Sequence, residues 1–263
     1  MSKDNQEKNE KHFKVSDINI GVYLPLHFFI ALTPIYPVMF LLSLYLNIFN
    51  YNIQIGLIFL PLIAIGLLLL YIIGVVYLTK FILIISSWRC KPEEGDHINR
   101  DFHSKIIYHY HLRGFLKKFP LWLIIRSPFP FLLKWMFTTF GLYKIGKNVL
   151  IYDSWIGLEF LEIEDNAIIG IGTILSSHLV DGMNQLAIRK IKLGKYSQWM
   201  HDCSAGPGLE IGENTIVHTK VGVPKFGKLR ENSVYVITDM DNVVYKRDLK
   251  ASKELKKRLG LRK

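Results

Sequence analysis

The sequence predicts a chain of the class α + β-solenoid: an N-terminal transmembrane helical hairpin with interfacial helices, then a left-handed parallel β-helix. Three observations predict it. One long segment has no charged side chain, the next interleaves aromatic with basic residues, and the C-terminal half repeats an aliphatic residue every six positions. We expect these parts, in chain order: a polar leader (1–17), a transmembrane hairpin (18–87), an interfacial aromatic and basic segment (88–142), a left-handed β-helix (143–240) and a basic C-terminal helix (241–263).

The hairpin is predicted from the interval 18–79, which contains no Asp, Glu, Lys or Arg. One spanning helix needs about 20 apolar residues, so this interval holds two spans and a turn. We expect the spans at Leu26 to Leu46 and Ile55 to Phe81, with a polar asparagine-rich turn between them. Pro34 and Pro37 are expected to kink the first span.

The distribution of Lys and Arg predicts the orientation. Basic residues flank the hairpin on both sides and are missing from its turn, so both ends are expected in the cytoplasm. The apolar run is too long for a cleaved signal peptide. Cys90 and Cys203 would then face a reducing compartment, and no disulfide is expected. The net charge of +11 flanks the apolar segment, so we expect membrane lipid as a partner and no nucleic acid.

The segment 88–142 carries charges too often for a span and aromatic rings too often for a solvated helix. It is expected to lie at the membrane interface, in short pieces broken by Pro120, Pro128 and Pro130. Packing of its aromatic rings between the hairpin and the C-terminal domain is the alternative. The last residues, Lys246 to Lys263, predict a basic amphipathic helix, either at the membrane surface or solvated.

The repeat is counted from Ile145. Aliphatic residues recur at multiples of six from it, Gly often follows them, and the fifth position of each unit is often small or β-branched. This period fits a triangular coil with three short strands per turn, in which the aliphatic residue points inward and the following position is crowded. Clear openers of such units are Ile145, Ile151, Ile163, Ile169, Leu175, Leu193, Ile211 and Val217.

These residues carry a resemblance to a known superfamily. Gly141-Leu142-Tyr143-Lys144-Ile145-Gly146-Lys147-Asn148-Val149, Ser177-His178-Leu179-Val180-Asp181-Gly182, Ile191-Lys192-Leu193-Gly194 and Ile211-Gly212-Glu213-Asn214-Thr215 resemble the hexapeptide-repeat acyltransferases. Helices before the repeat are similar to the membrane-associated terminal domains of poly-lysine-synthetase-like peptide synthetases. The resemblance implies acyl transfer from a thioester such as acyl-CoA to an amine or hydroxyl, a catalytic His, and a homotrimer, which the hairpin would restrict.

His178 is the first candidate for the catalytic base, because it precedes the interruption of the repeat at 181–190. Asp181, three residues later, is expected to orient its imidazole. His201 and His218 are secondary candidates, since their spacing is one position short of three repeat units and therefore close to one full coil. A His at a coil corner bonded to a nearby carbonyl is the alternative reading. Cys203 is expected to be a small buried residue and no nucleophile.

We therefore expect a membrane-anchored acyltransferase with a cytoplasmic catalytic domain, an acyl-CoA or other acyl thioester as donor, and a small-molecule or lipid-linked acceptor. The cofactor-binding residues are not predicted. A non-catalytic membrane scaffold is the first alternative. A zinc-dependent hydratase or hydrolase, with His178, His201 and His218 as ligands, is the second, although no metal is expected. Neither the acyl group nor the acceptor is encoded in a recognisable pattern.

Overall fold

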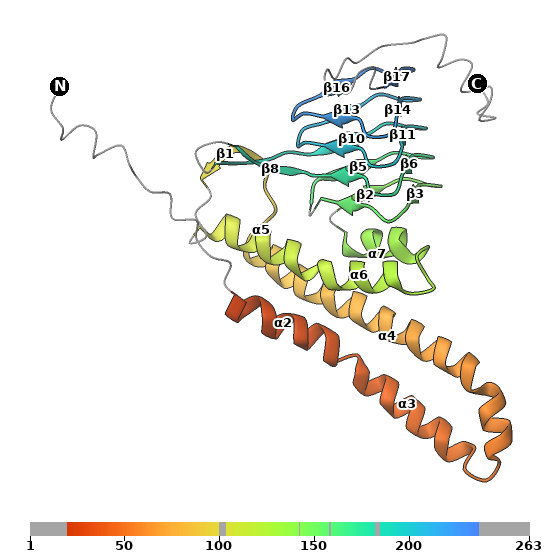
Figure 1. The fold of residues 1–263 in the computed structure, drawn as a ribbon. Coiled ribbons are helices and arrows are strands. Elements are labelled where there is room, and N and C mark those ends of the chain that lie inside the picture. The colour runs from red at the N-terminus through yellow and green to blue at the C-terminus, as the bar shows by residue number, and fades with distance from the viewer. Residues whose placement is uncertain (1–19, 100–103, 142, 158, 182–184, 237–263) are drawn as a thin grey trace, which may run out of the picture.

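The computed structural model describes residues 20–99, 104–141, 143–157, 159–181 and 185–236. It has three layers: a long helical hairpin, a layer of three shorter helices, and a β-solenoid above them (Figure 1). The expected class, apolar helices followed by a parallel β-solenoid, is confirmed. The leader 1–17 and the C-terminal helix expected at 241–263 lie outside the described residues.

The hairpin consists of α2 (Ile20–Leu32), α3 (Ile35–Ile48) and α4 (Ile53–Arg89). The break between α2 and α3 falls at Pro34, as expected from its missing backbone N–H. Pro37 causes no second break, because it lies in the first turn of α3, where the backbone N–H groups need no helical partner. The Tyr71 hydroxyl donates to the carbonyl of Ala31 at 2.9 Å and so satisfies a backbone acceptor next to the break.

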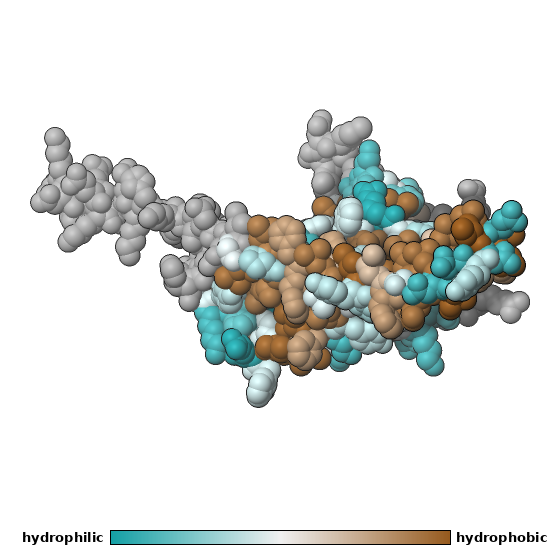
Figure 2. All heavy atoms as spheres, turned by 90° about the horizontal axis from the view of Figure 1, so that it is seen from below, coloured by the Kyte–Doolittle hydropathy of each residue, from teal (hydrophilic) through white to brown (hydrophobic). Residues whose placement is uncertain are grey.

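The hairpin is apolar on its outside. Segments Gly21–Ile48 and Ile53–Arg89 are long and apolar enough to cross a membrane, and only 17% and 11% of their most apolar windows are buried. The underside of the molecule is accordingly hydrophobic over much of its surface (Figure 2). Tyr51 at the tip is 98% exposed, and the tip lies at the end of the molecule remote from the solenoid (Figure 1).

The middle layer contains α5 (Lys105–Leu116), α6 (Lys118–Arg126) and α7 (Leu132–Phe140). Pro128 and Pro130 separate α6 from α7 as expected, whereas Pro120 is accommodated in the first turn of α6. Leu116, Ile124 and Met136 are fully buried against the hairpin and the solenoid. Internal packing thus accounts for the inner faces of these helices. Their outer faces expose large rings, among them Trp122 and Phe131.

The solenoid is built from three parallel sheets. The first contains β2 (Tyr143–Ile145), β5 (Leu161–Ile163), β10 (Ile191–Leu193), β13 (Glu210–Ile211) and β16 (Lys228–Leu229). The second contains β3 (Leu150–Ile151), β6 (Ile168–Ile169), β11 (Gln198–Trp199), β14 (Ile216–Val217) and β17 (Val234–Tyr235). The third contains β4 (Trp155–Ile156), β7 (Ile174–Leu175), β12 (Ser204–Ala205) and β15 (Gly222–Val223).

One coil of the solenoid takes three repeat units of six. Glu210 pairs with Lys228 and Ile216 with Val234, both at this spacing. Openers of the repeat point inward as predicted: Ile163, Ile169, Leu175, Leu193, Ile211 and Val217 are all buried. Small residues at the fifth position are buried too, among them Ala167, Thr173, Ser197, Cys203, Thr215 and Ser233. Each unit of six residues therefore forms one of the three walls of a coil.

Glycine and asparagine in the repeat have separate roles. A Cβ added at Gly212 would lie 2.3 Å from the backbone nitrogen of Glu231 in the next coil, so a side chain there is excluded. Asn214 has a φ of 54°, in the left-handed region that Asn tolerates better than most residues. Its side chain donates to Asn232 one coil further at 3.3 Å. The Ile-Gly-x-Asn pattern thus predicts a corner of the coil that packs directly against the same corner of the next coil.

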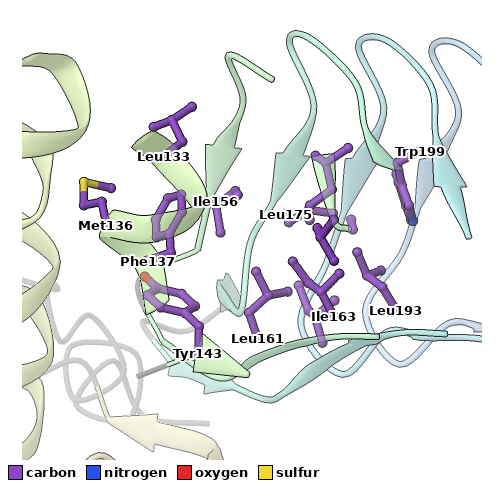
Figure 3. Close-up of a cluster of buried hydrophobic side chains, with 14 of the residues drawn as sticks. Leu133, Met136, Phe137, Tyr143, Ile156, Leu161, Ile163, Leu175, Leu193 and Trp199 are labelled. Carbon is purple, nitrogen blue, oxygen red and sulfur yellow. The ribbon is translucent and has the colours of Figure 1, made fainter. Parts of the chain in front are cut away.

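The interior of the column holds a tryptophan, and one end of the column is closed. Trp199 occupies an opener position and is fully buried in the column (Figure 3). At the first coil, Phe137 of α7 faces the column, and its ring lies 5.1 Å from that of Tyr143, whereas Met136 lies on the other side of α7, toward the helices (Figure 3). A solenoid needs a cap on its terminal coil, because that coil exposes apolar side chains and unpaired strand edges. Helix α7 provides it.

Candidate functional site

The repeat is interrupted by a flap. After β7 the chain leaves the third sheet as β8 (His178–Asp181), returns as β9 (Gln185–Ile188), and re-enters the solenoid at β10. Register confirms an insertion, because Gln198 pairs with Ile168 at a spacing of five repeat units instead of three. We call β8 and β9 the flap.

The flap has a third strand that the sequence did not predict. β1 (Gly95–Asn99), from the connection after α4, pairs antiparallel with β9. Arg189 forms an ion pair with Asp96, and the backbone N–H of Lys190 donates to Glu94 at 3.0 Å. Ile107 and Tyr110 of α5 pack against the flap. The flap is therefore held from both the hairpin connection and the middle layer.

His178 lies at the root of the flap. It is the first residue of β8, half-buried, and its ring faces that of Tyr110 edge-on at 5.5 Å between centroids. Burial, followed by the nearby Glu159 carboxylate, raises the pKa of Tyr110 far above its ordinary value, so its phenol stays neutral. His178 thus lies where the solenoid, the flap and the middle layer meet.

Ser176 lies beside the ring of His178. Its Oγ is 3.5 Å from Nδ1 and donates its own proton to the carbonyl of His178 at 2.6 Å. With that proton on the carbonyl, the hydroxyl oxygen is left as an acceptor, which favours a proton on Nδ1. In that tautomer Nε2 carries the lone pair that a general base needs.

Asp181 ends β8, and its backbone pairs with Gln185. Three residues of extended strand separate its Cα from that of His178 by about 10 Å. Its side chain lies outside the described part of the structure. Ser176 is the hydroxyl that the described structure brings to the His178 ring, and the expected role of Asp181 stays a prediction.

His201 and His218 lie at another corner, between the second and third sheets. The ring nitrogen Nδ1 of His201 accepts the backbone N–H of Ile171 at 3.2 Å, so a neutral His201 carries its proton on Nε2. That tautomer donates and does not act as a base at Nε2. Cys203, between the two, is fully buried, its thiol donates to the carbonyl of His218 at 3.0 Å, and burial raises its pKa. It is a packing residue, as expected.

The structure does not bring the three imidazoles together. His178 leaves the corner between the third and first sheets, whereas His201 and His218 lie on adjacent coils at the corner between the second and third. Within the described residues no cluster of three or more His, Cys, Asp or Glu side chains suits a metal ion. The three-histidine zinc arrangement is therefore not formed by these residues.

A buried charged cluster joins the middle layer to the first coil. The Nε and Nη2 atoms of Arg113 both donate to the carboxylate of Glu159, and Nη2 lies 3.2 Å from Oε2. The third nitrogen, Nη1, donates to the carbonyl of Cys90 at 2.9 Å. Lys117 Nζ donates to the hydroxyl of Tyr143 at 3.3 Å, and Tyr143 donates to the carbonyl of Gly157. Burial lowers the pKa of Lys117 to about 7.

This cluster occupies an irregular corner of the repeat. The paired residues Ile156 and Leu175 are separated by three repeat units plus one residue. The corner between β4 and β5 therefore holds one residue more than the other uninterrupted corners that join the third sheet to the first. Glu159 lies in that corner. The sequence shows two signals that point to it: a break in the repeat at Gly157, and two cations, Arg113 and Lys117, one helical turn apart.

Comparison with protein families and with curated proteins found no match. Among solved structures, a maltose O-acetyltransferase from Clostridium difficile 630 is 19% identical over 42% of this chain and 62% of its own, with a TM-score of 0.35. A hexapeptide-repeat-containing acetyltransferase from Vibrio cholerae O1 biovar eltor, complexed with acetyl coenzyme A, is 13% identical over 51% of this chain and 86% of its own, with a TM-score of 0.40. Serine acetyltransferase isoform 3 from Entamoeba histolytica is 11% identical over 83% and 77%, with a TM-score of 0.28. This chain thus spans less than two thirds of the first of these proteins, and the likeness adds nothing to the solenoid fold described above.

Proposed function

We propose that this protein is a membrane-anchored acyltransferase that moves an acyl group from a thioester to an amine or hydroxyl, with His178 as the general base. The observation that carries the proposal is the pairing of Ser176 with His178 at the root of the flap. It adds an oriented imidazole to a solenoid whose repeats resemble those of hexapeptide-repeat acyltransferases.

The proposed step needs one base. The acceptor gives its proton to Nε2 of His178 while its oxygen or nitrogen attacks the thioester carbonyl. A C–O or C–N bond forms, the C–S bond breaks, and the imidazolium returns the proton to the departing thiolate. Ser176 acts as a positioning residue, because it holds Nδ1 in the protonated form throughout. Acyl-CoA is the donor that we expect.

Membrane attachment is supported by exposure. A core helix of a soluble protein of this length would be mostly buried, whereas the two apolar segments of the hairpin are mostly exposed. Helix α4 is about 55 Å long at 1.5 Å per residue, longer than the roughly 30 Å of hydrocarbon in a bilayer. We infer that the half of the hairpin near the tip enters the membrane and that the solenoid lies on the cytoplasmic side, with the basic flanks.

The test is thiol release from a panel of acyl-CoA thioesters by the full chain in detergent, with a lipid extract and small amines as acceptors. His178→Ala should lose about 10²- to 10⁴-fold in rate, the usual contribution of a general base. His201→Ala is the matched control, since it removes an exposed imidazole from another corner, and should retain activity. Equal losses in both variants, or none in His178→Ala, would contradict the assignment.

The role of Ser176 needs a measurement that a packing residue would not change. Ser176→Thr keeps the hydroxyl and should retain the rate, whereas Ser176→Ala should lower kcat and move the acidic limb of its pH profile. An unchanged pH profile in Ser176→Ala would contradict the positioning role. A folded chain that anchors to membranes and transfers no acyl group from any thioester would favour the scaffold alternative.

A further inference from the structure

A groove of about 440 Å³ separates α6 from the first two coils of the solenoid. One wall is a single stripe of α6, which includes Lys118, Trp122 and Arg126. The opposite wall comes from the third sheet and its corner, and includes Trp155 and Ile174. The function proposed above makes no use of this groove.

The groove is apolar in its body and cationic along α6, and the carboxylate of Asp153 lines its solenoid side. The indole rings of Trp122 and Trp155 are 57% and 46% exposed, and Ile174 is 45% exposed. Lys118 Nζ lies 5.5 Å from the centroid of the Trp155 ring. Among the described residues, Arg126 has no carboxylate partner. Exposed indoles beside cations are costly to leave in water and suit a ligand with an apolar part and an anionic part.

The groove lies on the solenoid side of α4, beyond the half of the hairpin that we place in the membrane. Helix α6 packs on α4, whose side chains Phe81, Ile84 and Trp88 remain exposed at 60%, 54% and 87%. Tryptophans concentrate at membrane interfaces, and two exposed ones, Trp122 and Trp155, line this groove. A Lys or Arg side chain at the membrane surface is attracted to the lipid phosphates, and this attraction contributes about 1 kcal/mol of binding free energy for each cation.

We propose that this groove binds the phosphate-bearing headgroup of a membrane lipid, with Lys118 and Arg126 on the phosphate and the two tryptophans against the first carbons of its chains. A soluble phosphate compound would explain the cations and leave the indoles unexplained. A purely apolar occupant would leave the two cations with only the Asp153 carboxylate among the residues that line the groove. The proposal rests on the membrane attachment inferred above and is independent of acyl transfer.

The position of the groove links the lipid to the proposed base. Ile174, at one end of the groove, precedes His178 by four residues, which span at most about 14 Å of chain. A lipid in the groove would therefore lie beside the wall of the solenoid that leads into the flap. This arrangement fits an acceptor carried by the lipid or held near it.

The test uses tryptophan quenching by lipids brominated on their acyl chains near the headgroup. The full chain is reconstituted in nanodiscs of brominated phosphatidylglycerol or brominated phosphatidylcholine at 0.15 M salt. We expect stronger quenching by the anionic lipid, and loss of this excess in Lys118→Gln/Arg126→Gln. At about fivefold per cation, the preference for the anionic lipid should fall roughly 25-fold.

Two controls make the result specific. Lys144→Gln/Lys228→Gln removes the same charge from lysines that are 77% and 76% exposed on the first sheet, and should keep the excess quenching. Trp122→Phe/Trp155→Phe should remove it, because those rings report the contact. Three results would overturn the proposal. The excess quenching by the anionic lipid could fall equally in both charge variants, or it could persist without the two tryptophans. It could also be abolished by 10 mM inorganic phosphate. Thiol release plays no part in this readout.

Discussion

The ion pair between Arg113 and Glu159 should be the most sensitive point of the interface between the helices and the solenoid. The two side chains are 2% and 1% exposed, so neither charge is solvated. Glu159→Gln keeps the size of the side chain and removes its charge, which leaves the guanidinium buried without a counter-ion. Breaking a buried pair in this way costs about 3–5 kcal/mol.

The assay is thermal unfolding of the full chain in detergent, followed by intrinsic fluorescence. At roughly 2–4 °C per kcal/mol for a chain of about 150–250 residues, the melting temperature should fall by about 6–20 °C. Glu162→Gln is the matched control. Glu162 lies 3.7 Å from Lys144 and 3.8 Å from Lys190 in two surface pairs, each worth at most about 1 kcal/mol.

A double variant gives the sharpest form of this prediction. Arg113→Met/Glu159→Leu removes both charges and restores an apolar contact, so it should be more stable than Glu159→Gln alone. The reasoning is refuted if Glu159→Gln and Glu162→Gln shift the melting temperature equally. It is also refuted if the double variant loses as much as the two single changes together.

The remaining predictions concern pH, stacking and the interior. Burial lowers the pKa of Lys117 to about 7. Between about pH 7 and 10 the unfolded chain therefore binds one proton more than the folded chain at this side chain. The melting temperature should rise from pH 7 to 9, and it should rise less steeply in Lys117→Met. Gly212→Ala should destabilise the coils around it, since its Cβ would meet the backbone of the next coil. Glu164→Ala at the equivalent position loses only an exposed hydrogen bond from the backbone N–H of Lys195, so its effect should be smaller; equal melting temperatures of the two variants would contradict the stacking argument. Trp199→Ala should lower the free energy of unfolding by about 3–5 kcal/mol. Trp199→Phe should lower it clearly less, because the indole N–H that it removes has no hydrogen-bond partner among the described residues. Similar losses in the two variants would contradict this explanation.

The solenoid could be predicted because its information is local. Each coil repeats an inward aliphatic residue every six positions, and several corners add a crowded glycine or a left-handed asparagine. A pattern of this kind is visible in a single sequence and specifies the neighbouring coil as well. The apolar hairpin was predictable for a similar reason, since composition alone defines it.

The contacts between layers could not be predicted in the same way. β1 reaches the flap across about 90 residues, and Arg113 reaches Glu159 across 46. Nothing in the local pattern of Gly95–Asn99 marks it as a partner of β9. Such pairings depend on where the whole helical layer lies on the first coil.

The roles of His178 and Asp181 stay predictions, and the contact of Ser176 with His178 was not predicted. The sequence points to His178 because it precedes the interruption of the repeat, and to Asp181 because it is a carboxylate close in sequence. β7 ends at Leu175 and β8 begins at His178, and the chain bends between them at Ser177, so this bend brings the Ser176 hydroxyl to the His178 ring. No strand pattern joins Ser176 to His178, and the contact therefore could not be predicted from the local sequence.

Transfer of a labelled acyl group by the reconstituted protein tests the central claim most directly. The full chain in nanodiscs with a native-type lipid extract and small amines is given acyl-CoA labelled in the acyl group, and the label that leaves the thioester is followed into lipid and aqueous products. The account predicts transfer by the wild type and by His201→Ala, and a loss of about two orders of magnitude or more in His178→Ala. Label that stays on the thioester in the wild type, or equal transfer in His178→Ala, would contradict it.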